Sequence, residues 1–345
     1  MNLNARMFSG VLLALAVSGM ASFAACNHGK DVSEVSAKSP GPAGAEDLKS
    51  PTLSFPPDNT PRPAINSGRA MQYVKEIVAF GPRPIGSANH KKVEDYLLTR
   101  LKGDEVENDI FTIDTTEGKF PVHNIVAKFP GTNDGIIVIA SHYDTNYPLR
   151  NTSYIGANDG ASSSALLLEL ANQLRGKKRE GYSIWLVWDD AEEAMKPDNE
   201  VPFLDDSLYG IRHLAEKWEA DGTIKKIKAF LLADMIGDAD LNVDRDSNST
   251  PWLEDTVYEA ASRLGYQSHF FARTLPGVSD DHIPFVKRGV PSADLIDFDY
   301  GYNDVFWHTT QDTVDKLSPK SLEIVGSTIL ETISILDKMT PLPPK

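Results

Sequence analysis

Three predominantly apolar runs in the middle of the chain predict strands that are buried on both faces. They span residues 135–140, 182–188 and 227–233. Runs without polar alternation are typical of the central strands of a parallel sheet, because helices cover both faces of such a sheet. Shorter apolar segments predict further strands at residues 109–114, 123–129, 270–271 and 292–296.

Amphipathic segments with a helical period separate these strands. Apolar residues spaced three and four apart predict helices at residues 67–78, 89–101, 160–174, 208–218, 252–264 and 318–336. A further helix is expected at residues 281–288. Strands that alternate with helices predict a three-layer α/β/α sandwich around a mixed, mostly parallel central sheet. We find no internal repeat and expect one catalytic domain at residues 63–345.

The N-terminus has the pattern of an export signal. Residues 1–25 hold a basic Arg6, an apolar run at residues 11–17 and then small residues, a span too short for a transmembrane helix. Cys26 is the only cysteine and follows two alanines, as the lipidated cysteine of a bacterial lipoprotein does. We therefore expect a membrane-anchored lipoprotein of the bacterial periplasm. An ordinary signal peptide followed by an incidental cysteine is the alternative.

The segment after Cys26 predicts a flexible tether. Residues 26–62 are rich in Ser, Pro, Gly, Ala and charge, and a segment of that composition cannot build a core.

The net charge narrows the possible partners. The 345-residue chain carries 49 acidic and 34 basic residues, a net charge of -15. Such a balance argues against nucleic acid and against charge-driven binding to anionic lipid. The lipid anchor is then the one expected contact with a membrane, and we expect a monomer.

The second central strand ends in a concentration of carboxylates. Asp189, Asp190, Glu192 and Glu193 lie within five positions. Like charges repel and a desolvated carboxylate is costly without a partner, so a metal cation is an effective way to hold several of them. In an adjacent pair, one side chain can bind the metal while the other acts as a base. An acidic surface loop is the alternative for this stretch alone.

Residues of metal-ligand type follow the other central strands. His142 ends the first, Asp234 ends the third, Asp159 precedes a helix, and His308 lies near the C-terminus. The carboxyl ends of strands in an α/β sheet meet at one edge, where ligands bind. His, Asp and Glu without Cys suit a catalytic zinc that keeps an open coordination position.

Each of these residues also has a structural explanation when taken singly. His142 could hydrogen-bond a carbonyl, Asp159 could cap a helix, and His308 could belong to a turn. Their recurrence at successive strand ends favours the metal centre. His213 and His282, which lie in and at the start of predicted helices, are expected to be structural.

This set of residues resembles the metal centre of the bacterial di-zinc aminopeptidases. The chain resembles more closely the animal-type glutaminyl-peptide cyclotransferases, which share that fold. The closer match rests on residues 190–194 with residues 206–215, on residues 280–291, and on Trp307 directly before His308. It covers the chain from about residue 67 to the end.

The resemblance implies a zinc site and a catalytic acid. Asp159, Glu193 and His308 would bind one zinc ion, and Glu192 would be the proton shuttle.

The resemblance also implies a network of acidic residues and an aromatic wall of the substrate pocket. Asp234 and Asp280 would join Glu192 in the network, and Trp307 would wall the pocket for the substrate side chain. Asp281 is the alternative to Asp280 in the acidic network, because the aminopeptidases have an Asp directly before the corresponding His.

The implied reaction converts N-terminal glutaminyl residues of peptides or proteins to pyroglutamate and releases ammonia. The alternative is a zinc aminopeptidase that hydrolyses N-terminal residues, with a second zinc held by His142, Asp159 and Asp234. A non-catalytic binding protein on the same fold is a third, less favoured hypothesis.

Two departures from the cyclotransferase pattern concern aromatic residues. The family has an aromatic shortly after the Glu pair, where this chain has Met195-Lys196-Pro197-Asp198. Tyr300 and Tyr302, in a longer loop than the family's, are candidates either to replace that contact or to pack on the surface.

Overall fold

The computed structural model describes residues 53–59, 61–63, 65–197, 200–339 and 341–343. The predicted signal peptide at residues 1–25 and residues 26–52 of the predicted tether lie outside this range. Leu53 and Phe55 pack against the main core, and Arg263 donates a hydrogen bond of 2.7 Å to the carbonyl of Pro56. The packed part of the chain therefore begins before residue 63, because these two apolar side chains are partly buried against the domain.

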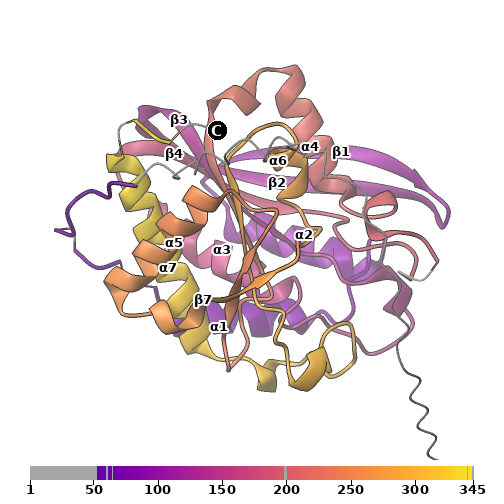
Figure 1. The fold of residues 1–345 in the computed structure, drawn as a ribbon. Coiled ribbons are helices and arrows are strands. Elements are labelled where there is room, and N and C mark those ends of the chain that lie inside the picture. The colour runs from indigo at the N-terminus through magenta and orange to yellow at the C-terminus, as the bar shows by residue number, and fades with distance from the viewer. Residues whose placement is uncertain (1–52, 60, 64, 198–199, 340, 344–345) are drawn as a thin grey trace, which may run out of the picture. The chain divides into compact units, whose positions relative to one another are not determined.

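The central sheet has six strands in the order β1-β2-β4-β3-β5-β8 (Figure 1). Strand β3 pairs in parallel with β4 and β5, and β5 pairs in parallel with β8, while β2 pairs antiparallel with β1 and β4. The expected mixed, mostly parallel sheet is confirmed. The strands are β1 Glu105–Thr115, β2 Gly118–Phe129, β3 Gly131–His142, β4 Arg179–Asp189, β5 Ile227–Asp234 and β8 Ser292–Ile296.

Helices cover both faces of the sheet, as in a three-layer sandwich. Helices α1, α2, α3, α5 and α7 contribute to the larger core cluster, and α4 and α6 contribute to the smaller one. Among the described residues, no helix combines the length and apolar character needed to span a membrane. The helices are α1 Ser67–Val78, α2 Ala88–Arg100, α3 Ala161–Leu174, α4 Tyr209–Ala220, α5 Pro251–Leu264, α6 Ile283–Val286 and α7 Pro319–Lys338.

Strand β3 explains why an uninterrupted apolar run predicts a central strand. Successive side chains of a strand point to opposite faces of the sheet. Ile137 and Ile139 belong to the larger core cluster, and Val138 and Ala140 belong to the smaller one. Both faces of the middle of β3, residues 136–140, are thus dry, so no position in that run favours a polar residue.

Four elements differ from their prediction. Strands β1 and β2 form a hairpin longer than expected, because its outer part alternates exposed and buried residues and lacks a long apolar run. Strand β6, Val243–Asp246, was not predicted because its sequence is mostly charged; it pairs with β7, Phe270–Leu275, in a separate two-stranded sheet. Helix α6 has only four residues.

Candidate metal centre

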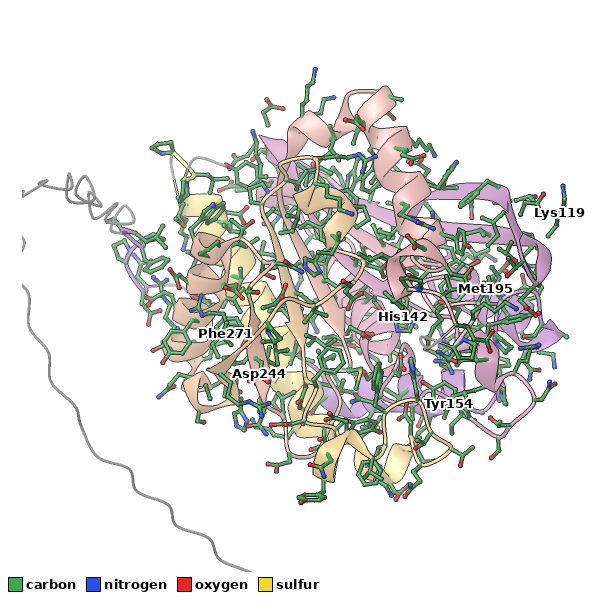
Figure 2. The ribbon with its side chains drawn as sticks, turned by 45° about the vertical axis from the view of Figure 1, so that its right-hand side comes forward. Lys119, His142, Tyr154, Met195, Asp244 and Phe271 are labelled. Atoms are coloured by element: carbon green, nitrogen blue, oxygen red, sulfur yellow. The ribbon has the colours of Figure 1, made fainter. Side chains whose placement is uncertain are left out.

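The polar residues predicted at the strand ends do meet at one edge of the sheet. His142 is the last residue of β3, Asp234 is the last residue of β5, and Glu192 and Glu193 follow the end of β4. Asp159 lies just before α3, and its carboxylate accepts a hydrogen bond of 2.6 Å from the hydroxyl of Tyr154. Figure 2 labels His142 and Tyr154 at this edge.

Asp159, Glu193 and His308 form one cluster of possible metal ligands. Nε2 of His308 lies 3.3 Å from Oδ2 of Asp159 and 3.2 Å from Oε2 of Glu193. Both carboxylates are buried, and Oε1 of Glu193 has no hydrogen-bond partner. One imidazole and two carboxylates in contact are a donor set that suits zinc, so these three residues fit the expected metal.

His142, Asp159 and Asp234 form a second cluster that shares Asp159 with the first. Nε2 of His142 lies 3.1 Å from Oδ1 of Asp159 and 3.3 Å from Oδ1 of Asp234. All three side chains are buried. The ligand set that an aminopeptidase would need for a second metal is therefore also assembled.

The turn that carries the Glu pair is held by Asp190 and Asp144. Ala191 adopts a positive φ of 56°, and its backbone N–H donates to the carboxylate of Asp190. The backbone N–H groups of Glu192 and Glu193 point at the carboxylate of Asp144, at 3.3 and 3.4 Å. This turn directs the two adjacent glutamates to different places, as the sequence suggested for a ligand and a base.

A cavity of about 360 Å³ opens beside the first cluster. Three carboxyl groups expected to act in catalysis, those of Glu192, Asp234 and Asp280, line it together with the side chains of Trp307 and His308. The Trp307 ring stacks on the His308 ring with centroids 4.3 Å apart. All five of these predicted residues therefore face one small space.

Asp280, rather than Asp281, faces the cavity. Asp281 is fully buried outside it, and burial together with the nearby charges of Asp189 and Glu192 raises the pKa of its carboxyl well above the ordinary value. Burial also raises the pKa of Asp280, and the charge of Asp234 adds to the effect. Asp234 is thus close enough to Asp280 to influence the protonation of the Asp280 carboxyl.

Burial is likewise the main reason why the pKa of Glu192 lies well above its ordinary value. The charges of Glu193 and Asp280 raise it further, although the imidazole of His142 opposes them. Glu192 is therefore a group that can hold a proton inside the cavity.

Phe203 supplies an aromatic wall that the sequence did not reveal. Phe203 and Phe298 both line the cavity, whereas Met195 is buried in a separate apolar cluster. Tyr302 is 87 % exposed, and Tyr300 is buried with its hydroxyl 2.6 Å from Asp312, so neither tyrosine takes this place. The insert after the Glu pair brings Phe203 back to the cavity ten residues after Glu193, and no sequence pattern in that insert indicates this return.

Sequence reasoning also missed Arg83, which holds the loop before Asp159. Its guanidinium is fully buried and donates hydrogen bonds to the backbone carbonyls of Tyr143, Ile155, Gly156 and Asp159. The segment around Arg83 reads as a turn because prolines flank it, and nothing in that pattern indicates burial.

Asp312 was missed as well. Its carboxylate accepts hydrogen bonds from the backbone N–H groups of Asn158 at 2.8 Å and Asp159 at 3.2 Å. Arg83 and Asp312 therefore fix the backbone of Asp159 from two sides.

Comparison with known proteins agrees with this geometry. The model of the family described as "Peptidase family M28" matches residues 124–333. The glutaminyl-peptide cyclotransferase of Drosophila melanogaster is 30 % identical over 257 residues, which cover 67 % of this chain and 70 % of the relative.

Solved structures resemble the chain over most of its length. A glutaminyl cyclase from an Acidobacteriales bacterium has a TM-score of 0.77 and 47 % identity, and the match covers 83 % of this chain and 99 % of that one. A Zn-dependent exopeptidase from Parabacteroides distasonis has a TM-score of 0.72 and 28 % identity, with 79 % and 99 % covered.

Proposed function

Because the chain belongs to peptidase family M28 and, within it, resembles the glutaminyl-peptide cyclotransferases in sequence and fold, we propose that it is a zinc-dependent glutaminyl cyclase. The proposed reaction converts an N-terminal glutaminyl residue of a peptide or protein to pyroglutamate. The α-amine forms a bond to the γ-carbonyl carbon, the bond from that carbon to the amide nitrogen breaks, and ammonia leaves. No water is consumed.

Asp159, Glu193 and His308 are the proposed zinc ligands. Their ligand atoms lie within 4.8 Å of one another, and the unpartnered Oε1 of Glu193 supports a cation at this place. When bound, zinc supplies Lewis-acid polarisation of the γ-carbonyl oxygen.

The cavity supports a substrate that inserts one side chain. Its volume of about 360 Å³ is at the small end of the range of roughly 300–1,000 Å³ typical of ligand pockets. Trp307, Phe203 and Phe298 give it apolar walls that exclude water from the reacting groups. A glutamine side chain would lie along these walls with its amide directed at the carboxyl groups.

Glu192 is the proposed proton shuttle. It would accept a proton from the attacking α-amine and deliver it to the leaving amide nitrogen. Asp234 and Asp280 would join Glu192 in an acidic network, in which the charge of Asp234 helps to keep a proton on Asp280 by raising its pKa. The presence of Glu192, Asp234 and Asp280 together in one small cavity beside the ligand cluster carries this proposal.

A zinc aminopeptidase is the second candidate. The observation that favours it is the complete second ligand cluster of His142, Asp159 and Asp234. In that function Glu192 would take its proton from water. The two candidates therefore differ in whether Asp234 binds a second metal or belongs to the acidic network of Glu192 and Asp280.

The products formed from two test substrates distinguish the cyclase from the aminopeptidase. The purified zinc-loaded protein would be incubated with a Gln-initiated peptide and, separately, with a leucine anilide. Ammonia and a pyroglutamyl peptide from the first, with no aniline from the second, support the cyclase. Free amino acid and aniline without ammonia would establish the aminopeptidase instead.

The N-terminal assignments stand as proposals beside this one. We propose a signal peptide at residues 1–25 and a lipid anchor on Cys26 that holds a monomeric enzyme at a membrane of the bacterial periplasm. Incorporation of labelled palmitate into the wild-type chain, and its loss in Cys26→Ala, would support the anchor. Equal labelling of both proteins would refute it.

A further inference from the structure

Asp246, His282 and Asp294 form a buried cluster that shares no residue with the two clusters of the candidate centre. Asp246 ends β6, His282 directly precedes α6, and Asp294 lies in the middle of β8. The side chains of His282 and Asp294 are inaccessible to solvent, and that of Asp246 is nearly so. Asp244, labelled in Figure 2, marks strand β6, at some distance from His142 in that view.

The ring nitrogens of His282 are close to carboxylates but are not hydrogen-bonded to them. Nε2 lies 3.0 Å from Oδ2 of Asp246, and Nδ1 lies 3.8 Å from Oδ2 of Asp294. Neither nitrogen makes a hydrogen bond of acceptable geometry, and for Nδ1 the distance alone is too long. A fully buried imidazole with both nitrogens unpaired is costly unless another group binds it.

The other described histidines provide an internal comparison. Only His142, in the candidate metal centre, shares the property of His282: both of its ring nitrogens are buried and unpaired although carboxylates lie nearby. Each of the other described histidines has at least one ring nitrogen in a hydrogen bond, which is the case for His90, His123, His213, His269 and His308.

Asp294 adds two further oxygen atoms that could bind a metal and that have no hydrogen-bond partner. Both of its carboxylate oxygens are buried without a hydrogen-bond partner. Asp246, by contrast, is firmly placed: its carboxylate accepts hydrogen bonds from the backbone N–H of Val278 at 2.7 Å and from the hydroxyl of Ser249 at 3.0 Å. The cluster therefore combines a fixed carboxylate with an imidazole and a carboxylate that lack partners.

We propose that Asp246, His282 and Asp294 bind a further zinc ion. This site is separate from both ligand clusters of the candidate metal centre. An imidazole and carboxylates are the nitrogen and oxygen donors that zinc accepts, and a bidentate Asp294 would complete four donors. Calcium does not suit the site, since it takes six to eight oxygen ligands. A divalent cation would also balance the two carboxylate charges beside a neutral imidazole.

This zinc would be structural and would fix the wall of the cavity. It would connect β6, β8 and the segment that leads into α6. Asp280 lies two residues before His282, and residues 275–280 line the cavity. Holding His282 to the sheet would therefore hold Asp280 toward Glu192.

The test counts zinc in matched variants. Zinc per folded chain would be measured by inductively coupled plasma mass spectrometry in the wild type, His282→Gln, Asp294→Asn and His90→Gln, after dialysis into metal-free buffer. His90→Gln is the control, because His90 is also buried between two carboxylates but is hydrogen-bonded to Asp190. We expect His282→Gln and Asp294→Asn to hold one zinc equivalent less than the wild type and His90→Gln to hold as much.

Equal zinc content in the wild type and in folded Asp294→Asn would overturn the proposal. If the variants do not fold, anomalous diffraction at the zinc edge from wild-type crystals decides. A peak between His282 and Asp294 supports the site. A peak beside His308 with none at His282 overturns it.

Discussion

His90 and Asp190 form a buried contact, with Nε2 of His90 2.7 Å from Oδ1 of Asp190. It ties helix α2 to the turn that carries Glu192 and Glu193. Burial alone would lower the pKa of His90, but the charge of Asp190 and hydrogen bonds to Asp190 and Glu94 outweigh it and raise that pKa to about 10. His90 is therefore a cation in the folded protein at neutral pH.

We expect this ion pair to make the protein less stable in alkali. The pKa of His90 in the folded state lies above its ordinary value of 6.5, so the folded protein holds a proton that the unfolded chain releases. The stabilisation is complete below pH 6.5 and is lost as the pH rises toward about 10.

Urea denaturation between pH 6 and pH 10 would measure how the free energy of unfolding depends on the charge of His90. The wild type should lose more stability over that interval than His90→Gln does. At neutral pH the variant should be destabilised by about 3–5 kcal/mol, as expected when one partner of a buried ion pair is removed. Parallel pH profiles of the two proteins would contradict the assignment of a charged His90.

The two adjacent glutamates should fail in different ways. Glu192→Gln removes the proposed proton shuttle and should lower kcat by roughly 10²- to 10⁴-fold while zinc stays bound. Glu193→Gln removes a proposed ligand and should lose one zinc equivalent. Ammonia release and zinc content measured on the same preparations would show the difference. Full activity in Glu192→Gln with unchanged zinc would exclude it as the shuttle.

Arg83 should affect the metal centre without touching it. Arg83→Met leaves several buried carbonyl oxygens without a donor, at about 1–3 kcal/mol for each unsatisfied group. Because one of those carbonyls belongs to Asp159, we also expect zinc affinity to fall by about 10- to 100-fold. Competition with a zinc chelator and urea denaturation would measure both effects.

Arg175→Met is a matched control for Arg83→Met. Arg175 is 36 % exposed, and its guanidinium donates to the carboxylate of Asp104, whose side chain is only 5 % exposed. Its replacement should therefore cost stability, because it leaves that carboxylate without its partner, but it should leave zinc affinity unchanged. If both variants weaken zinc binding equally, the role given to Arg83 is wrong.

The aromatic walls should govern substrate binding. Trp307→Ala and Phe203→Ala should each raise KM for a Gln-initiated peptide by roughly 5- to 10-fold, since an aromatic contact contributes about 0.5–1.5 kcal/mol beyond its buried area. Phe271→Ala, in β7 and outside the cavity, serves as the control. An unchanged KM in Phe203→Ala would show that this residue does not contact the substrate.

The arrangement of the sheet could be predicted because its signals are local. The apolar runs in β3, β4 and β5 are continuous in the chain, and their polar ends follow directly in sequence. Strand ends in parallel register meet at one edge whatever the rest of the fold does. His142, Glu193 and Asp234 could therefore be placed together from the sequence alone.

Residues brought in from distant segments could not be predicted in this way. Phe203 reaches the cavity through an insert, and Arg83 reaches the Asp159 loop from a turn more than seventy residues earlier in the chain. The choice between Asp280 and Asp281 depends on which way one short segment turns at the edge of the sheet. The composition of a single segment does not predict how it packs against a distant one.

Hydrophobic periodicity and the residues that follow each strand thus determined the fold class and the principal acidic and imidazole groups, because both depend on neighbours in the chain. The tertiary structure alone decided which carboxyl group faces the cavity, which aromatics wall it, and that His282 lies unpaired between Asp246 and Asp294. These features depend on contacts between segments far apart in the chain, and such contacts exist only once the sheet has formed and buried them.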